Sequence, residues 1–329
     1  MNHEMWISNT TENATPCPDG MDCKLYILTH SDLPLKYQIP QSNHTAMEFA
    51  AQYPAEFLEW HKKSNSIIVL NCQNERKLIE FAQKLRDKGI KFSEFREPDI
   101  GNELTAIAIC PGPEIKRLCS GLPLAGKRTN EGAEDRLNRK FEIMDAMKTC
   151  EQRSGQNIWE HGESVRDHLM DLLKFLRDSR YTSKYTWRYP QWLLSHSREL
   201  LGCLPPDHVL EKYALWHDCG KPFCKVQDEN GKVHYPDHAK VSASIFRELY
   251  PEQEDVATLI EMDMDIHLLP ADRIEEFCTR PQAIALLLTA VAEVHANAEL
   301  FGGITTDSFK IKWKHLGRRG ASIWKRLFE

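Results

Sequence analysis

Ala214-Leu215-Trp216-His217-Asp218-Cys219-Gly220-Lys221-Pro222 is the stretch that decides the fold of the second half of this chain. Its apolar residues indicate the end of a helix, and the Gly-Lys-Pro sequence that follows stops that helix. His217 and Asp218 are adjacent polar side chains at the end of this apolar segment, where each needs a polar partner. Imidazole nitrogen and carboxylate oxygen are ligands that suit transition metals, so a metal site is the first interpretation. A capped helix end without a metal is the alternative that these residues leave open.

Three more histidines of this half lie near the ends of expected helices. His161 follows Trp159-Glu160 and precedes an apolar stretch with leucines at helical spacing. His238 stands at the start of a later helical segment, and His267 stands near the end of another. We expect these three histidines to join the His-Asp pair as metal ligands.

The order of these residues along the chain, His161, then His217-Asp218, then a later acid, resembles the HD superfamily of metal-dependent phosphohydrolases. The resemblance covers roughly residues 140–305 and is specific around the His-Asp pair. It implies an all-α domain over residues 140–329 that holds one or two divalent transition metal ions, Mn, Fe, Co, Ni or Zn. His238 and His267 resemble the extra ligands of the family members that hold two metals.

The last ligand of that family is usually an aspartate in an apolar helix, and this chain departs from the pattern there. The matching helix covers residues 285–297, and its acid in register is Glu293, whose longer side chain can still reach a metal. Asp263 and Asp265 are weaker candidates for the same role. The departure leaves the number and the identity of the metal ions open.

The resemblance also implies a reaction. Bound metals lower the pKa of a water molecule and polarise phosphoryl oxygens. Asp218 would bridge the metals, and Lys221 would neutralise the phosphate. The expected activity is hydrolysis of a phosphomonoester or phosphodiester, with a nucleotide or an RNA end as the substrate.

The first ~125 residues have a different pattern, because short apolar strands alternate with helices. This alternation predicts an α/β domain with a mixed sheet and flanking helices. The expected strands cover residues 24–28, 66–70, 91–95 and 104–109, and the expected helices cover residues 46–51 and 75–88. The predicted organisation is an extension at residues 1–22, the α/β domain at 23–125, a polar linker at 126–139 and the helical domain at 140–329.

Several short motifs of residues 23–125 resemble the type 2 peptidyl-tRNA hydrolases, the archaeal and eukaryotic form. They include Asp32-Leu33, Gln41, residues 97–101, residues 104–108 and Pro111-Gly112-Pro113. The resemblance implies that Lys36, His44 and Asp99, with Thr105 nearby, serve hydrolysis of the ester that links a peptide to tRNA. A histidine near a carboxylate can act as a general base, and a lysine and a hydroxyl can stabilise a phosphate or an oxyanion.

This chain departs from that family as well. The passage from Asp32 to His44 is about two residues shorter than usual and lacks a basic glycine-containing loop, and the loop after Asp99 is short. Three interpretations therefore stay open for the domain: intact peptidyl-tRNA hydrolysis, substrate binding without that reaction, and a purely structural domain.

Composition limits the other possibilities. The chain has 329 residues, enough for two domains with hydrophobic cores, and its formal net charge of −6 argues against nucleic-acid binding over the whole surface. No apolar run approaches the ~20 residues of a membrane span, so we expect no membrane contact and a cytoplasmic location. We also expect reduced thiols, Cys17 and Cys23 included. The oligomeric state is not predicted.

Residues 310–326 form a basic segment with seven Lys or Arg, and Trp313 and Trp324 lie among them. Cations and aromatic rings together can hold phosphates and stack bases. The other interpretation is a terminal helix that packs its tryptophans on the core and leaves its charges in water.

Two functions from different classes follow. In the first, the helical domain is the phosphohydrolase and the α/β domain helps to select the substrate. In the second, the α/β domain binds tRNA or hydrolyses a tRNA ester, and the helical domain is regulatory.

Overall fold

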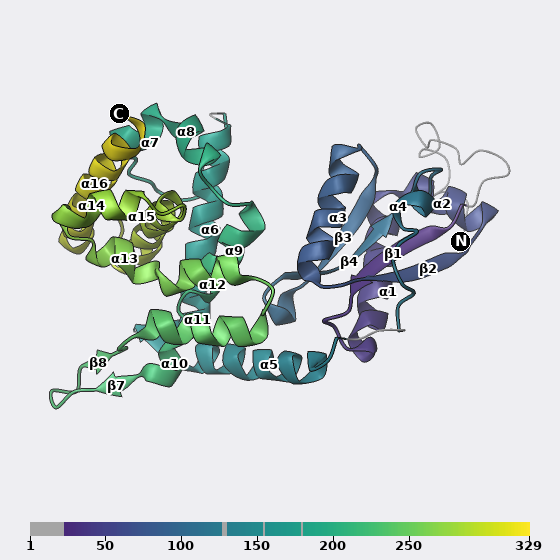
Figure 1. The fold of residues 1–329 in the computed structure, drawn as a ribbon, viewed down its shortest axis with the longest axis horizontal. Coiled ribbons are helices and arrows are strands. Elements are labelled where there is room, and N and C mark those ends of the chain that lie inside the picture. Colours follow the sequence, from purple (N-terminus) through teal and green to yellow (C-terminus); the bar gives the residue numbers. More distant parts are fainter. Residues whose placement is uncertain (1–22, 127–129, 154, 179) are drawn as a thin grey trace, which may run out of the picture. The chain divides into compact units, whose positions relative to one another are not determined.

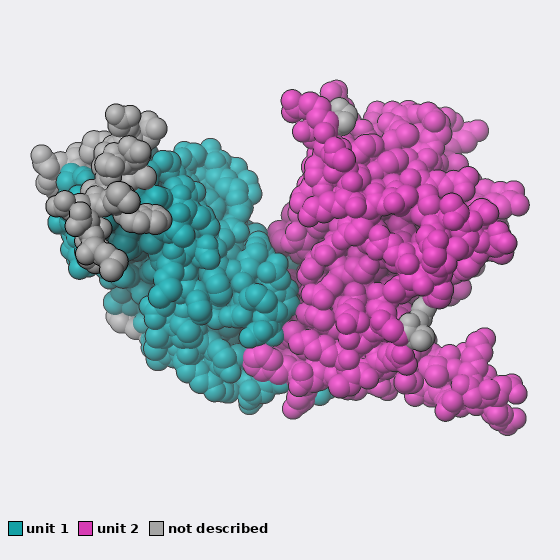
Figure 2. Space-filling view, turned by 180° about the vertical axis from the view of Figure 1, so that it is seen from behind, with its two compact units in different colours: residues 1–139 teal, residues 140–329 magenta. Residues whose placement is uncertain are grey.

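The computed structural model describes residues 23–126, 130–153, 155–178 and 180–329 (Figure 1). It divides into two compact units, residues 1–139 and residues 140–329, which Figure 2 shows in different colours. The expected extension at residues 1–22 lies outside the described residues. Helix α5 (Ala133–Thr149) begins before the division and ends after it. The expected linker at 126–139 is therefore helical from residue 133 onward, and its residues 127–129 lie outside the described part.

The first unit contains a four-stranded mixed sheet with the strand order β2-β1-β4-β3. β1 (Leu25–His30) pairs parallel with β2 (Ile67–Cys72) and antiparallel with β4 (Glu103–Ile109). β3 (Phe92–Glu97) pairs antiparallel with β4 at one edge. Both central strands are buried along their whole length, because helices cover both faces of the sheet. The mixed sheet with flanking helices confirms the sequence prediction for this region.

Alternate residues of β1 face two separate cores. Leu25 and Ile27 pack with Phe49 of α1 (Leu35–Gln52) and Trp60 of α2 (Pro54–Lys63). Tyr26 and Leu28 pack in the other core, with α3 (Glu75–Asp87) and α4 (Ile115–Leu118). The 3-10 helix η1 (Pro98–Ile100) links β3 to β4.

Helix α1 begins eleven residues earlier than the predicted segment at 46–51, and α2 was not predicted. Pro40 lies inside α1, where it lacks the N–H of one helical hydrogen bond, and its presence argues against a helix when only the sequence is read. Packing of α1 against the sheet stabilises the helix in spite of this missing hydrogen bond.

The second unit is almost entirely helical. Its helices are α6 (Ile158–Arg177), α7 (Gln191–Ser195), α8 (Ser197–Gly202), α9 (Asp207–Trp216), α10 (Lys221–Cys224), α11 (His238–Leu249), α12 (Glu254–Glu261), α13 (Asp263–Leu268), η2 (Ala271–Arg273), α14 (Ile274–Cys278), α15 (Ala283–Leu300) and α16 (Asp307–Phe328). Two small hairpins interrupt them, β5 (Glu151–Arg153) with β6 (Gln156–Asn157) and β7 (Val226–Gln227) with β8 (Val233–His234). The all-helical prediction is correct apart from these hairpins.

Helix α15 forms the centre of this unit, with other helices around it (Figure 1). By length and composition alone it could cross a membrane, but 83% of it is buried inside the unit. An apolar helix of this kind is typical of the core of a large helical domain. Its few polar residues, Glu293 among them, are therefore placed within the protein interior.

The basic terminal segment lies on α16. Trp313 is buried in the core of the unit, and the ring of Trp324 stacks on His196 at 3.9 Å between centroids. The structure therefore supports the interpretation in which the tryptophans pack on the protein.

One cysteine prediction is wrong. Cys23 is disulfide-bonded, whereas the sequence led us to expect a reduced thiol. The residue Cys17, which shared that prediction, lies outside the described residues. The free cysteines of the described part are Cys72, Cys110, Cys119, Cys150, Cys203, Cys219, Cys224 and Cys278.

Candidate metal centre

The start of α6 fixes the first candidate ligand. The Asn157 side chain accepts from the N–H of Glu160 at 2.8 Å, and the Glu160 carboxylate accepts from the N–H of Asn157 at 3.0 Å. This capping box defines where the helix begins. His161 follows directly in the first turn and is buried. The sequence prediction that His161 opens a helix is thus nearly right, since the helix begins three residues earlier.

A glycine allows α6 to approach α9 very closely. A Cβ atom on Gly162 would lie 2.3 Å from the carbonyl oxygen of Leu215, which leaves no room for any side chain. Because Gly162 is next to His161, this approach brings the rings of His161 and His217 to 5.3 Å between centroids. The sequence between these two histidines gives no sign of this contact.

A second glycine brings α11 to the same place. The N–H of Gly220 donates to Ser242 Oγ at 2.8 Å, and a Cβ atom on Gly220 would lie 2.5 Å from the backbone nitrogen of Ser242. This packing places His238, at the start of α11, with its Nε2 3.6 Å from Asp218 Oδ1. The tight turn after the His-Asp pair therefore also positions a third histidine.

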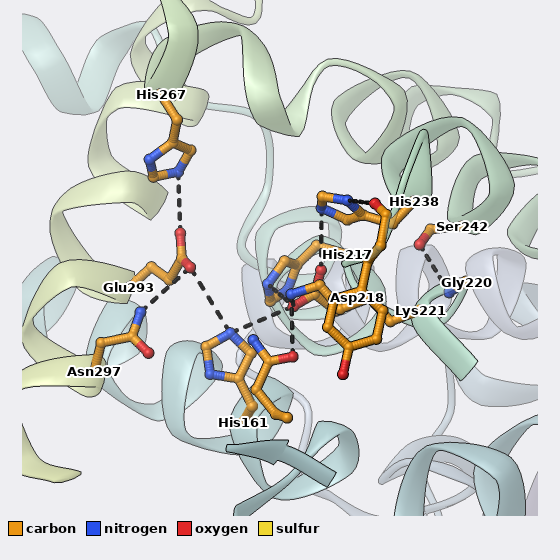
Figure 3. Close-up of polar contacts among 12 residues, drawn as sticks. His161, His217, Asp218, Gly220, Lys221, His238, Ser242, His267, Glu293 and Asn297 are labelled. Atoms are coloured by element: carbon orange, nitrogen blue, oxygen red, sulfur yellow. Dashed lines mark hydrogen bonds and ion pairs between the residues drawn. The ribbon is translucent and has the colours of Figure 1, made fainter. Parts of the chain in front are cut away.

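The side chains from α6, from the end of α9 and from α15 converge (Figure 3). His217 Nε2 lies 3.3 Å and His161 Nε2 lies 3.5 Å from Asp218 Oδ2. His161 Nε2 also lies 3.8 Å from Glu293 Oε1. One ligand atom from each of His161, His217 and Glu293 can be chosen so that all lie within 4.8 Å of one another. His161, His217, Asp218 and Glu293 are called the ligand cluster below.

Several polar atoms of the ligand cluster are buried without a partner. Within the described part of the chain, both ring nitrogens of His161, Nε2 of His217 and Oδ1 of Asp218 make no hydrogen bond. Buried polar groups that lack a partner are destabilising, and native proteins contain few of them. A cation held between His161 Nε2, His217 Nε2 and the carboxylates of Asp218 and Glu293 would satisfy these two ring nitrogens together, so the residues fit a metal ion.

Backbone carbonyls orient two of the histidines. His217 Nδ1 lies 2.8 Å from the carbonyl oxygen of Ala214, and His238 Nδ1 lies 3.0 Å from that of Tyr235. A carbonyl only accepts, so Nδ1 carries a proton in each ring, and Nε2 is the nitrogen that lies near Asp218. This arrangement is typical of histidines that bind metals.

Charge in the cluster is strongly perturbed. Burial lowers the pKa of His161 to about 4, despite the nearby carboxylate of Asp218. Burial opposes charge on Asp218 as well, but the Lys221 ammonium and His217 outweigh it and hold the pKa of Asp218 well below its usual value. Glu293 has a lowered pKa in spite of its burial, because His267 and the cluster histidines favour the carboxylate. Both acids are therefore anionic at neutral pH, as ligands of a cation must be.

Lys221 contacts Asp218, and its expected role toward a substrate phosphate stays a prediction. Its Nζ donates to Asp218 Oδ2 at 2.5 Å and to Gln152 Oε1 at 3.1 Å. The ammonium group is mostly buried, with 11% of the side chain exposed. In the structure it is thus bound to the carboxylate of Asp218.

The two remaining histidines each reach one carboxylate. His267 Nε2 lies 3.0 Å from Glu293 Oε2, on the other side of that carboxylate from His161 (Figure 3). Among the carboxylates of the described residues, His238 similarly approaches Asp218, with its Nε2 3.6 Å from Oδ1. Of the six expected ligands, four converge and these two lie at the margin.

The acids considered as substitutes for Glu293 have other partners. Tyr213 Oη donates to Asp263 Oδ1 at 2.6 Å, and Arg280 forms an ion pair with Asp265. The structure places Glu293 among the other ligands, and Asn297 Nδ2 donates to its Oε1 at 3.3 Å. Asn297 and Gln152 had no assigned role, because a neutral amide far away in sequence gives no signal of a metal site.

The residues of the second expected site, in the first unit, are less closely connected. Among the described contacts, no hydrogen bond or ion pair joins Lys36, His44 and Asp99 to one another. Lys36 forms an ion pair with Glu134, and the exposed ring of His44 stacks on Phe95 at 4.6 Å. Asp99 is exposed in η1.

A buried network runs beside His44. Thr105 Oγ1 donates to Gln41 Oε1 at 2.7 Å, and Gln41 Nε2 donates to Glu97 Oε2 at 2.7 Å. Thr105 is therefore held inside the sheet, and Gln41 connects it to Glu97. Gln41 and Glu97 belong to the motifs that carry the resemblance, but their contact depends on the packing of α1 against β3 and β4.

Comparison with known proteins supports the resemblance of the first unit to peptidyl-tRNA hydrolases. Residues 23–124 match the model of the family Peptidyl-tRNA hydrolase PTH2. No curated protein matches the chain. The matched family is one of hydrolases that act on a tRNA-linked substrate, and the match ends before the helical unit begins.

Proposed function

We propose that residues 140–329 form a metal-dependent phosphohydrolase of the HD type, which cleaves a phosphoester of a nucleotide or an RNA end. The observation that carries the proposal is the set of buried, unpartnered ligand atoms on His161, His217 and Asp218. Two carboxylates and two or more imidazoles suit Mn, Fe, Co, Ni or Zn. The resemblance of the His-Asp segment to the HD superfamily supports the same conclusion.

The geometry favours one metal ion over two. His161, His217, Asp218 and Glu293 would hold it, since their ligand atoms converge. On the other side of Asp218, His238 is the one further imidazole that the described contacts bring near, with its Nε2 3.6 Å from Oδ1. One histidine and one shared carboxylate are fewer protein ligands than a transition metal site usually has.

The residues of the ligand cluster and their neighbours each have a part in the proposed reaction. A bound metal supplies a water of lowered pKa and polarises the phosphoryl oxygen. The carbonyl of Ala214 accepts from His217 Nδ1 and so orients Nε2 toward the cluster. Lys221 fixes the orientation of Asp218, and Asn297 fixes that of Glu293.

Metal content tests this function. The purified chain is expected to contain about one transition metal ion that a chelator removes, together with any phosphoesterase activity. His217→Ala with Asp218→Ala is expected to abolish both. The matched control is His234→Ala with Asp228→Ala, a His-Asp pair on the surface at 2.9 Å. A chelated, metal-free protein with full activity would exclude the proposal.

A second function is proposed for the first unit, namely that it binds tRNA and hydrolyses the ester of peptidyl-tRNA. The family match over residues 23–124 carries it. The substrate of the chain would then be tRNA-linked, and the helical unit would regulate the reaction. Any contact with RNA should weaken steeply with salt, because phosphate contacts release counterions.

The two functions are separable by substitution. Lys36→Ala with His44→Ala is expected to lower tRNA binding or peptidyl-tRNA hydrolysis by about tenfold or more, as for the loss of a catalytic acid or base. Phosphoesterase activity should not change. Lys62→Ala with His61→Ala is the matched control, since it removes the same residue types from the exposed end of α2. If wild-type protein neither binds tRNA at low salt nor cleaves peptidyl-tRNA, the first unit has another role. A cytoplasmic location remains a prediction for either function.

A further inference from the structure

A cleft beside the ligand cluster has a basic wall. Its volume is about 410 Å³, and Glu293 and His267 are among its lining residues. A face of α16 also lines it. Its other lining residues are Val294, Asn297, Ile311, Lys312, His315, Leu316 and Arg319.

We propose that this cleft receives the substrate, and that Lys312, His315 and Arg319 bind the phosphate of a phosphomonoester of nucleotide size. The inference rests on the proposed phosphohydrolase function and names the substrate class for that site. The shared chemistry is a terminal phosphate with one nucleoside attached, which a free mononucleotide and a phosphorylated RNA end both present.

Helix geometry places the three polar residues together. They are spaced three and four positions apart, which puts them on one face of α16. Arg319 donates to the carbonyl oxygens of Leu269 at 3.0 Å and His267 at 2.8 Å. Both acceptors are uncharged, and among the described contacts no carboxylate pairs with Arg319. Its positive charge therefore remains available to an anion in the cleft.

The apolar residues of the cleft offer a surface for the nucleoside part of the ligand. Ile311 lines the cleft and exposes 62% of its surface. Together with Val294 and Leu316 it gives the cleft an apolar side next to the basic one. A volume of this size suits a small organic ligand. A nucleoside against the apolar side would leave its phosphate between α16 and Glu293.

The test measures binding of adenosine 5′-monophosphate to the full chain by titration calorimetry, with metal content determined on the same samples. Lys312→Ala with His315→Ala is expected to weaken binding about tenfold or more, since hydrogen bonds to charged phosphate are lost. Metal content should stay unchanged, because neither residue belongs to the ligand cluster. Arg319 is left intact, since its hydrogen bonds hold the backbone of His267.

The matched control is Lys314→Ala with Arg318→Ala, which removes two cations from exposed positions of α16 outside the cleft. Its binding should stay within about twofold of wild type, as expected for surface charges at a distance. Equal losses in the control and the cleft variant would show a general charge effect and would overturn the inference.

Binding of related ligands shows which part of the nucleotide the cleft recognises. Adenosine without a phosphate should bind much more weakly, and adenosine that binds as tightly as its monophosphate would overturn the inference. A 5′-phosphorylated trinucleotide that binds more tightly than the mononucleotide, with the same sensitivity to the cleft variant, assigns the site to RNA ends. The reverse order assigns it to free nucleotides. Binding that is lost in the cleft variant of a protein without metal or activity would support the cleft and refute the proposed phosphohydrolase function.

Discussion

Lys221 is the residue whose position most changes the interpretation of the site. It lies three residues after Asp218 and is the first residue of α10. Its ammonium therefore forms an ion pair with the Asp218 carboxylate, which lies just after the end of α9. A buried charge that loses its partner destabilises a protein strongly, by about 3–5 kcal/mol. The ammonium therefore compensates Asp218 whenever no other cation does.

The first prediction follows from this role. Lys221→Met is expected to lower the free energy of unfolding of the metal-free protein by about 3 kcal/mol, because Asp218 is left uncompensated. With metal bound the loss should be smaller, since a second source of positive charge faces the same carboxylate. Urea denaturation followed by tryptophan fluorescence, with and without chelator, measures both values. Lys225→Met, an exposed neighbour, is the control. An equal loss under both conditions would contradict the prediction.

At the scale of elements, two glycines determine how closely the helices of the site approach. The helical interior normally disfavours glycine by about 0.5–1 kcal/mol relative to alanine. Gly162 is nevertheless required in α6, because any Cβ would collide with the backbone of Leu215. Contact between α6 and α9 thus depends on a residue that weakens α6 itself.

The second prediction tests this contact. Gly162→Ala is expected to destabilise the helical unit by about 1–3 kcal/mol, because forced overpacking outweighs the gain in helix propensity. It should also lower metal content, since His161 is moved away from His217. Gly202→Ala is the control, as a Cβ there would meet no atom within 4 Å. Thermal unfolding and metal analysis give the two readouts, and a stabilised Gly162→Ala protein would show that the helices separate without penalty.

At the scale of the whole molecule, α5 belongs to both units. Its first turn carries Glu134, the partner of Lys36, whereas its second half carries Ile143, Met144 and Met147, which are buried in the helical core. The division at residue 139 therefore lies within a helix, and the second unit needs the second half of that helix.

The third prediction concerns fragments. A fragment that begins at Gly132 is expected to bind metal as the full chain does, because every proposed ligand lies in residues 158–293 and α5 is retained. A fragment that begins at Cys150 lacks the three buried side chains of α5, each of which contributes roughly 1.5–3 kcal/mol when fully buried. It should melt at a lower temperature or aggregate. Equal melting temperatures of the two fragments would show that α5 is dispensable for the second unit.

The sequence by itself determined the features that depend on neighbouring residues. The His217-Asp218 pair, the helix after His161, the apolar α15 and the alternation of β1 all follow from local patterns of two or three to four residues. The mixed sheet of the first unit was predicted from the same signals. Such patterns are readable because strand and helix periodicity is imposed by the backbone and is repeated within each segment.

Only the tertiary structure decided which distant residues meet. In the structure Glu293 lies in the ligand cluster, whereas Asp263 accepts a hydrogen bond from Tyr213. Lys221 forms an ion pair with Asp218, and α16 lines the cleft. The physical reason is that these contacts depend on the approach of whole helices, as at Gly162, where the absence of one side chain sets the distance between two segments more than fifty residues apart. Local sequence records the residue that permits such an approach but does not record its partner.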